Sequence, residues 1–163
     1  MRKFENREIL YKTIITIFFV VSFLCAPKVG FLPLGVEGFC LTNNLLFPLS
    51  HANIFHLACN LWCMWLLRPP YYWVSAIVIS FLCSLLPEFT SEPIMGASGI
   101  IFAIIGARYG VRNNAKRLIR NTWLPFIVMA FMPNVACLYH LYCIGVGFCW
   151  GYIKETWRLT RIR

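Results

Sequence analysis

The amino-acid sequence predicts an all-α, polytopic membrane protein, a bundle of six transmembrane helices. Hydrophobic residues make up 60% of its 163 residues and charged residues only 13%, whereas soluble domains carry about 25% charged residues. The mean hydropathy is +0.68, and the charged residues lie in clusters between long apolar runs. This composition excludes a soluble enzyme, a collagen, a disordered tail and a secreted disulfide-stabilised domain.

Hydropathy and helix-breaking residues together locate the six spans. About 20 residues cross a bilayer as a helix, so residues 1–163 are expected to form one transmembrane domain with short cytoplasmic segments at both ends. The first apolar run lacks the cleavage pattern of a signal peptide and is expected to remain as a span. The predicted spans are Ile9 to Ala26, Ile54 to Leu67, Tyr72 to Leu86, Ile94 to Tyr109, Leu118 to Met132 and Val135 to Ile153.

Several of these spans are short for a bilayer, and the fifth is the least continuous because Pro125 interrupts it. Short spans require a thinned membrane or a site that lies in a shallow depression.

The distribution of basic residues tests the number of spans, because lysine and arginine in short loops stay on the cytoplasmic side. With six spans, 14 of the 15 basic residues lie on the side of the two termini, and only Lys28 lies outside. Five spans would put the basic C-terminal tail on the wrong side. We therefore expect both termini in the cytoplasm of a bacterium, with the protein in the inner membrane. The net charge of +9 then reports orientation and not nucleic-acid binding, and we interpret the basic loop over residues 108–120 as solvated rather than lipid-bound.

The acidic residues and cysteines limit the chemistry. All six acidic residues lie outside the predicted spans, which argues against an aspartyl protease, a zinc protease with a His-Glu-x-x-His motif and a proton-coupled carrier. The eight cysteines lie almost entirely in apolar runs, where a thiol behaves as a small hydrophobe, so no disulfide framework is expected. The sequence predicts neither a metal site nor a cofactor.

Polar side chains open the second predicted span. His56 and Asn60 are four residues apart and share one face of a helix, whereas His51 is expected to point elsewhere and to hold the turn before the span. A single histidine in a membrane helix serves as often to form a structural hydrogen bond between helices as to carry out a function. The case for function therefore depends on the other spans.

The fourth and sixth predicted spans supply the other polar groups. Gly96 and Gly99 flank Ser98, whose hydroxyl stands at a helix N-terminus beside unpaired N–H groups and a positive dipole. His140 lies about two turns into the sixth span, and the glycine pair ending it, like Gly106 with Gly110, predicts close helix packing.

The topology brings these groups to one depth. The second, fourth and sixth spans all run from outside inward, so His56, Ser98 and His140 would each lie roughly 5–10 Å below the outer surface. Ser98 and His140 can then form a nucleophile–base pair, with Phe102 as the ring that stacks on the imidazole. His56 and Asn60 would donate to the oxyanion beside the Ser98 backbone N–H.

The sequence resembles the rhomboid intramembrane serine proteases. The motifs behind this resemblance run in order through the second to sixth predicted spans: His51-x-x-x-x-His56-x-x-x-Asn60, Gly96-x-Ser98-Gly99, and His140 with Gly147 seven residues on. The resemblance implies that Ser98 and His140 are the catalytic dyad. It also implies that His56 and Asn60 line the oxyanion hole.

Three features depart from the family pattern. Residues 27–50 contain neither Trp nor Arg, although the family often has a Trp-Arg pair in the first outer loop. Cys143 replaces a common glycine and is large enough to loosen the approach of the fourth and sixth spans. Phe102 replaces a common tyrosine. None of these departures removes a reacting group.

The expected function is a serine endopeptidase that cleaves transmembrane protein substrates within the lipid bilayer, near the outer face. A catalytically silent relative that binds transmembrane helices is the alternative, and intact Ser98 and His140 count against it. A small channel or carrier with a histidine-lined pore is disfavoured by the shared shallow depth and by the absence of acids within the spans.

Overall fold

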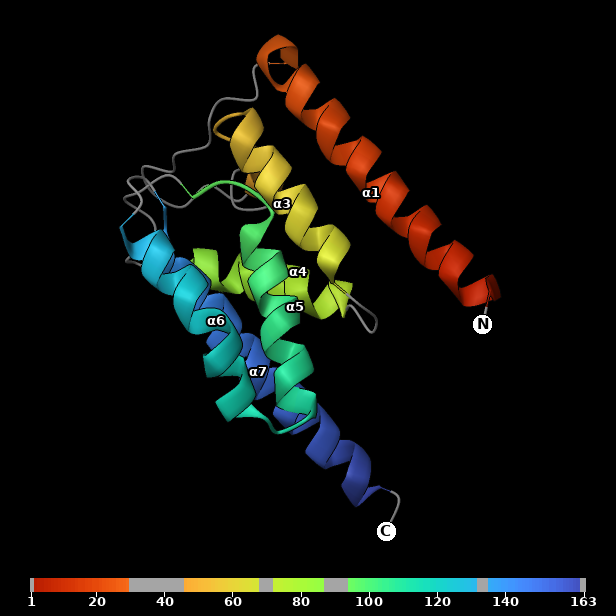
Figure 1. The fold of residues 1–163 in the computed structure, drawn as a ribbon, viewed down its shortest axis with the longest axis vertical. Helices are drawn as coiled ribbons and strands as arrows, with labels where there is room; N and C mark the ends of the chain where they lie inside the picture. Colours follow the sequence, from red (N-terminus) through yellow and green to blue (C-terminus); the bar gives the residue numbers. More distant parts are fainter. Residues whose placement is uncertain (1, 30–45, 68–71, 87–93, 132–134, 162–163) are drawn as a thin grey trace.

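The structure is a computed structural model that describes residues 2–29, 46–67, 72–86, 94–131 and 135–161. These residues form six α-helices and one short 3-10 helix and contain no strand, so the predicted all-α fold is confirmed. The elements are α1 (Arg2–Val29), η1 (Phe47–Leu49), α3 (Ile54–Leu66), α4 (Trp73–Ser84), α5 (Ser98–Val111), α6 (Ala115–Ala130) and α7 (Cys137–Thr160). In Figure 1, α5 occupies the centre, with α3, α4, α6 and α7 around it and α1 set apart.

The tightest packing joins α5 to α7. Four glycines make it possible, because a Cβ atom on any of them would lie 2.0–2.4 Å from a backbone oxygen of the facing helix. They are Gly106 and Gly110 on α5 and Gly147 and Gly151 on α7. The backbones of α5 and α7 are therefore in direct contact at these glycines. The four-residue spacing of each glycine pair predicts such close packing.

The starts of α5 and α6 differ from the predicted residues for local reasons. α5 begins at Ser98, later than expected, because Gly96 has φ +94° and a right-handed helix cannot continue through that conformation. α6 begins at Ala115, earlier than expected, because the Asn114 side chain accepts a 3.0 Å hydrogen bond from the Arg117 backbone N–H. This N-cap satisfies one of the unpaired donors of the first turn.

α1 and α7 extend beyond their predicted spans, and α1 covers Arg2–Val29 where the sequence predicts Ile9 to Ala26. α6 does not extend past its predicted end. α6 continues through Pro125 to Ala130, and its predicted end at Met132 lies outside the described residues. α7 continues to Thr160, past the apolar run, and its last turns contain an ion pair in which Arg158 Nη2 lies 2.6 Å from Glu155 Oε1. Polar turns thus lengthen α7 beyond the predicted span.

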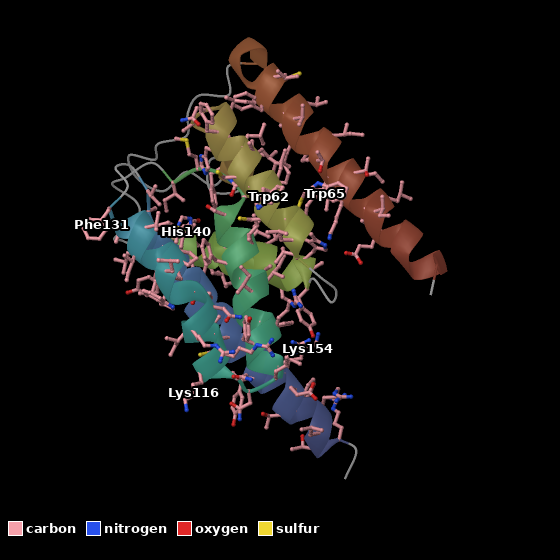
Figure 2. All side chains as sticks on the ribbon, viewed as in Figure 1. Trp62, Trp65, Lys116, Phe131, His140 and Lys154 are labelled. Carbon is pink, nitrogen blue, oxygen red and sulfur yellow. The ribbon has the colours of Figure 1, made fainter. Side chains whose placement is uncertain are left out.

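α1 is tied to the rest of the molecule through α3. The Lys12 ammonium, buried between the two helices, donates to the backbone oxygens of Trp65 at 2.9 Å and Leu67 at 2.7 Å and pairs with Glu8 at 2.8 Å. It therefore satisfies carbonyls at the C-terminal end of α3 that have no partner within the helix. The Trp65 indole N–H, which projects into the gap in Figure 2, donates to the Thr16 hydroxyl at 2.9 Å.

The outer surface of the bundle is apolar. Large hydrophobic side chains such as Phe55, Val74 and Phe131 are exposed, as a lipid-facing surface requires. Among the described helices, α1 alone is both long and apolar enough to cross a membrane by itself, over Glu8–Cys25, while α3, α4 and α5 are apolar but have fewer than 18 residues. At about 1.5 Å per residue the 13-residue α3 spans about 20 Å, in keeping with the short spans that the sequence predicts.

The bundle of α5, α6 and α7 has chemically different ends. In Figure 2, His140 and Phe131 lie toward one end, and Lys116 and Lys154 lie toward the other. The polar pair described next lies at the first of these ends.

Candidate active site

Ser98 and His140 meet between α5 and α7. Ser98 is the first residue of α5 and His140 lies in the first turn of α7. The Ser98 Oγ and His140 Nε2 atoms are 2.7 Å apart and hydrogen-bonded. The imidazole is buried and the serine is partly exposed, so the hydroxyl is the more accessible member of the pair.

The other ring nitrogen of His140 has no hydrogen-bond partner among the described residues, although it is buried. When the serine hydroxyl donates to Nε2, the imidazole proton is on Nδ1, and leaving that donor unpaired costs about 1–3 kcal/mol. The ring is held by packing instead. Phe102 lies with its centroid 4.8 Å from the imidazole and tilted by 36°, and Phe126 lies 5.3 Å from Phe102.

His56 and Asn60 on α3 lie against Gly96, two residues before the serine. A Cβ atom on Gly96 would lie 2.7 Å from His56 Nε2 and 3.0 Å from Asn60 Nδ2. The Ala52 backbone N–H donates to His56 Nδ1 at 3.4 Å, which puts the imidazole proton on Nε2. Asn60 Nδ2 is buried and has no hydrogen-bond partner in the part of the chain that the structure describes. Two side-chain donors therefore converge on the turn that leads into Ser98.

His51 lies before α3, as expected, but its ring does not point away from the site. Its Nδ1 atom lies 3.3 Å from the Leu49 backbone oxygen. The ring packs 5.2 Å from His56 and 5.7 Å from Phe19 of α1, centroid to centroid. His51, Asn60 and Phe19 line a cavity of about 20 Å³, together with residues of α5 such as Ile100. Helical spacing does not predict this contact, because His51 lies before the first residue of α3, Ile54.

Tyr139, which the sequence analysis did not single out, is fully buried beside His140. Its hydroxyl lies 2.7 Å from Ser80 Oγ and donates to the Ser80 backbone oxygen at 3.0 Å. Its ring fills the space over Gly99, where an added Cβ would lie 2.3 Å from the tyrosine oxygen. The two partners are 59 residues apart in sequence, so only the fold brings them together.

Cys143 does not separate α5 from α7. Its side chain is buried in the same hydrophobic cluster as Cys83 of α4. The contact with α5 runs instead through Gly147, where a Cβ would lie 2.4 Å from the Ala103 oxygen. The expected loosening is therefore absent from this structure. Most of the first outer loop, residues 30–45, lies outside the described part of the chain.

The arrangement supplies the groups that acyl transfer needs. A hydroxyl is hydrogen-bonded to a neutral imidazole, and side-chain donors lie beside the N–H groups that open α5. Within the described residues, no three His, Cys, Asp or Glu side chains are grouped to hold a metal ion.

Comparison with known proteins identifies one family. Residues 41–156 match the rhomboid domain, which covers more than half of the chain and both members of the Ser98–His140 pair. No curated protein and no solved structure matches the chain. The chain therefore belongs to the rhomboid family.

Proposed function

We propose that this protein is an intramembrane serine endopeptidase that cleaves transmembrane proteins near the outer face of the membrane. A rhomboid domain implies an integral membrane bundle, and such domains are typically serine proteases that act on membrane proteins. The observation behind the proposal is the 2.7 Å hydrogen bond between Ser98 Oγ and His140 Nε2. A silent relative would have no need of this pair.

In the first half of the reaction, Ser98 Oγ attacks the carbonyl carbon of the scissile peptide while His140 Nε2 takes the hydroxyl proton. The carbonyl oxygen becomes an oxyanion. His56 Nε2–H, Asn60 Nδ2–H and the Ser98 backbone N–H donate to it. The C–N bond then breaks, and the imidazolium protonates the leaving amine.

In the second half, water attacks the acyl-enzyme at the same carbonyl carbon. His140 takes a proton from the water and returns it to Ser98 Oγ, which releases the new carboxyl group and restores the serine. Water must therefore reach the site from outside, and the position of both groups at helix starts is suited to this. A substrate helix must also unwind locally, because a hydrogen-bonded helix shields its carbonyl groups.

The same proposal includes the architecture. One domain of six spans would lie in the bacterial inner membrane, with the termini and the basic loops in the cytoplasm. The basic residues Lys116 and Lys154 lie at the end opposite His140 in Figure 2, which supports this orientation.

A fluorophosphonate probe tests the chemistry without a substrate, because it reacts with activated serines. We expect labelling of the wild type and none of Ser98→Ala. Ser75→Ala, which removes a hydroxyl from α4 outside the site, is the control and should label like the wild type. A wild type that is folded but never labels would favour the silent, helix-binding alternative.

A further inference from the structure

The structure contains a second polar pair immediately behind the candidate dyad. Tyr139 and Ser80 are almost completely shielded from solvent, with exposed fractions of 0% and 1%. The serine carbonyl can only accept, so the single tyrosine proton goes to it at 3.0 Å. The serine hydroxyl then donates back to the tyrosine oxygen at 2.7 Å. The pairing is reciprocal and ties α7 to α4.

The Tyr139 side chain packs against the backbone next to the dyad. Tyr139 directly precedes His140, and its ring occupies the space over Gly99, which directly follows Ser98. Phe47 of η1 packs on the same ring, with centroids 6.1 Å apart and planes at 78°. One side chain thus contacts the backbone next to the nucleophile while its own backbone holds the base.

The first turn of α7 also contacts α6, where the Cys137 thiol donates to the Phe126 backbone oxygen at 3.8 Å. The N-cap residue of α7, Ala136, offers no side-chain cap. His140 Nδ1 has no hydrogen-bond partner among the described residues, so within them the imidazole is held by Phe102 and by the backbone of this turn. The place of the base therefore depends on where the backbone of this turn lies.

We propose that Tyr139, through its hydrogen-bond pair with Ser80, is a positioning residue for His140. The pair holds the first turn of α7 at the distance and rotation that put Nε2 on the serine hydroxyl. Neither residue touches the substrate. The inference rests on the proposed protease activity, because it concerns the geometry of that dyad. A misplacement of about 1 Å can lower a reaction rate by about 100-fold.

The test measures Tyr139→Phe and Ser80→Ala, each of which removes one hydroxyl and keeps the rest of the packing. We expect the rate constant of fluorophosphonate labelling and the kcat for a transmembrane substrate to fall together, by about tenfold or more in Tyr139→Phe and by less in Ser80→Ala, which keeps the bond from the tyrosine to the Ser80 backbone oxygen. The KM should stay within about twofold, because the substrate site is intact. The double variant should be no slower than Tyr139→Phe, because that change already removes both hydrogen bonds, whereas Ser80→Ala removes only the 2.7 Å bond and keeps the one to the Ser80 backbone oxygen.

Tyr109→Phe is the matched control. The Tyr109 hydroxyl accepts a hydrogen bond of the same 2.7 Å length from Asn121, between α5 and α6 and away from the dyad. This variant should label at the wild-type rate. Thermal unfolding and circular dichroism give the folded fraction of each variant, and all rates are expressed per folded protein. Ser80→Ala keeps the test possible if Tyr139→Phe does not fold.

Three results would overturn the positioning role: wild-type labelling rates in folded Tyr139→Phe or Ser80→Ala, an equal loss in Tyr109→Phe, or a change in KM alone. In each of these cases the wild type still labels at Ser98, and the proposed protease function stands. If the wild type itself does not label at Ser98, the proposed function fails first, and the inference fails with it.

Discussion

At the scale of single residues, the His140 imidazole is held by contacts and not by a third polar partner. Phe102 lies against one side of it, while Nδ1 has no hydrogen-bond partner in the described residues. A serine–histidine dyad of this kind has to rely on the surrounding packing to orient its base. The donors beside Gly96 are a separate unit, contributed by α3.

These donors give the first prediction. His56→Ala and Asn60→Ala should each lower kcat by about 100-fold to 1,000-fold and leave KM nearly unchanged, because hydrogen bonds to an oxyanion strengthen in the transition state. The remaining donors reduce the loss toward the lower value. The measurement is initial cleavage rate against substrate concentration in detergent, for protein that is verified as folded.

His51→Ala is the comparison variant. His51 packs on Phe19 and His56. Its removal should therefore lower the thermal unfolding midpoint, while the kcat of the protein that remains folded should change little. The donors would be wrongly assigned if His51→Ala lost turnover without loss of stability while the other two variants kept full turnover.

Residue patterns predicted the Ser98–His140 pair of the candidate site, but not the residues that pack behind it. Ser98 and His140 could be paired from their places in two spans, because the predicted topology puts both near helix starts at the same depth. The Tyr139–Ser80 pair gave no such signal. A tyrosine and a serine within apolar runs are compatible with many packings, and their contact depends on the rotation of α4 and α7, which hydropathy does not specify.

At the scale of helices, the glycines decide how close α5 comes to α7. Gly106→Ala should lower the thermal stability by about 1–3 kcal/mol and slow probe labelling, because its Cβ would lie 2.1 Å from the Ile144 oxygen. The displaced helices would carry Ser98 and His140 apart. Thermal unfolding and labelling rates measured on the same preparation test both effects.

Gly145 provides the control on α7. Nothing lies within 4 Å of a Cβ added there, so Gly145→Ala should leave labelling unchanged and raise helix stability by about 0.5–1 kcal/mol. Equal behaviour of the two alanine variants would contradict the close-packing account.

The helix ends show what hydropathy misses. The start of α6 is set by the Asn114 cap and that of α5 by the left-handed Gly96, and neither property appears in a count of apolar residues. The end of α7 lies beyond the apolar run because the polar residues of its last turns are compatible with a helix that is exposed to water. Helix existence follows from burial in lipid or protein, whereas helix ends follow from local hydrogen bonds and backbone angles.

At the scale of the whole molecule, the charge distribution predicts the orientation. Reporter fusions at both ends should report the cytoplasm, because six spans then keep 14 of the 15 basic residues inside. A fusion at position 28 should report the outer side. A C-terminal reporter found outside would contradict the topology, and with it the argument that the dyad lies near the outer face.

Proteolysis by the purified protein in liposomes tests the central claim most directly. Wild type, Ser98→Ala, His140→Ala and the double variant are co-reconstituted with a panel of single-span membrane proteins, and the cleavage sites are read by mass spectrometry. We expect the wild type to cut near the outer end of a substrate helix. Each single variant should lose proteolysis while remaining folded, and the double variant should be hardly worse than either, because the two residues act as one unit. Strong cleavage by pure Ser98→Ala protein would contradict the account.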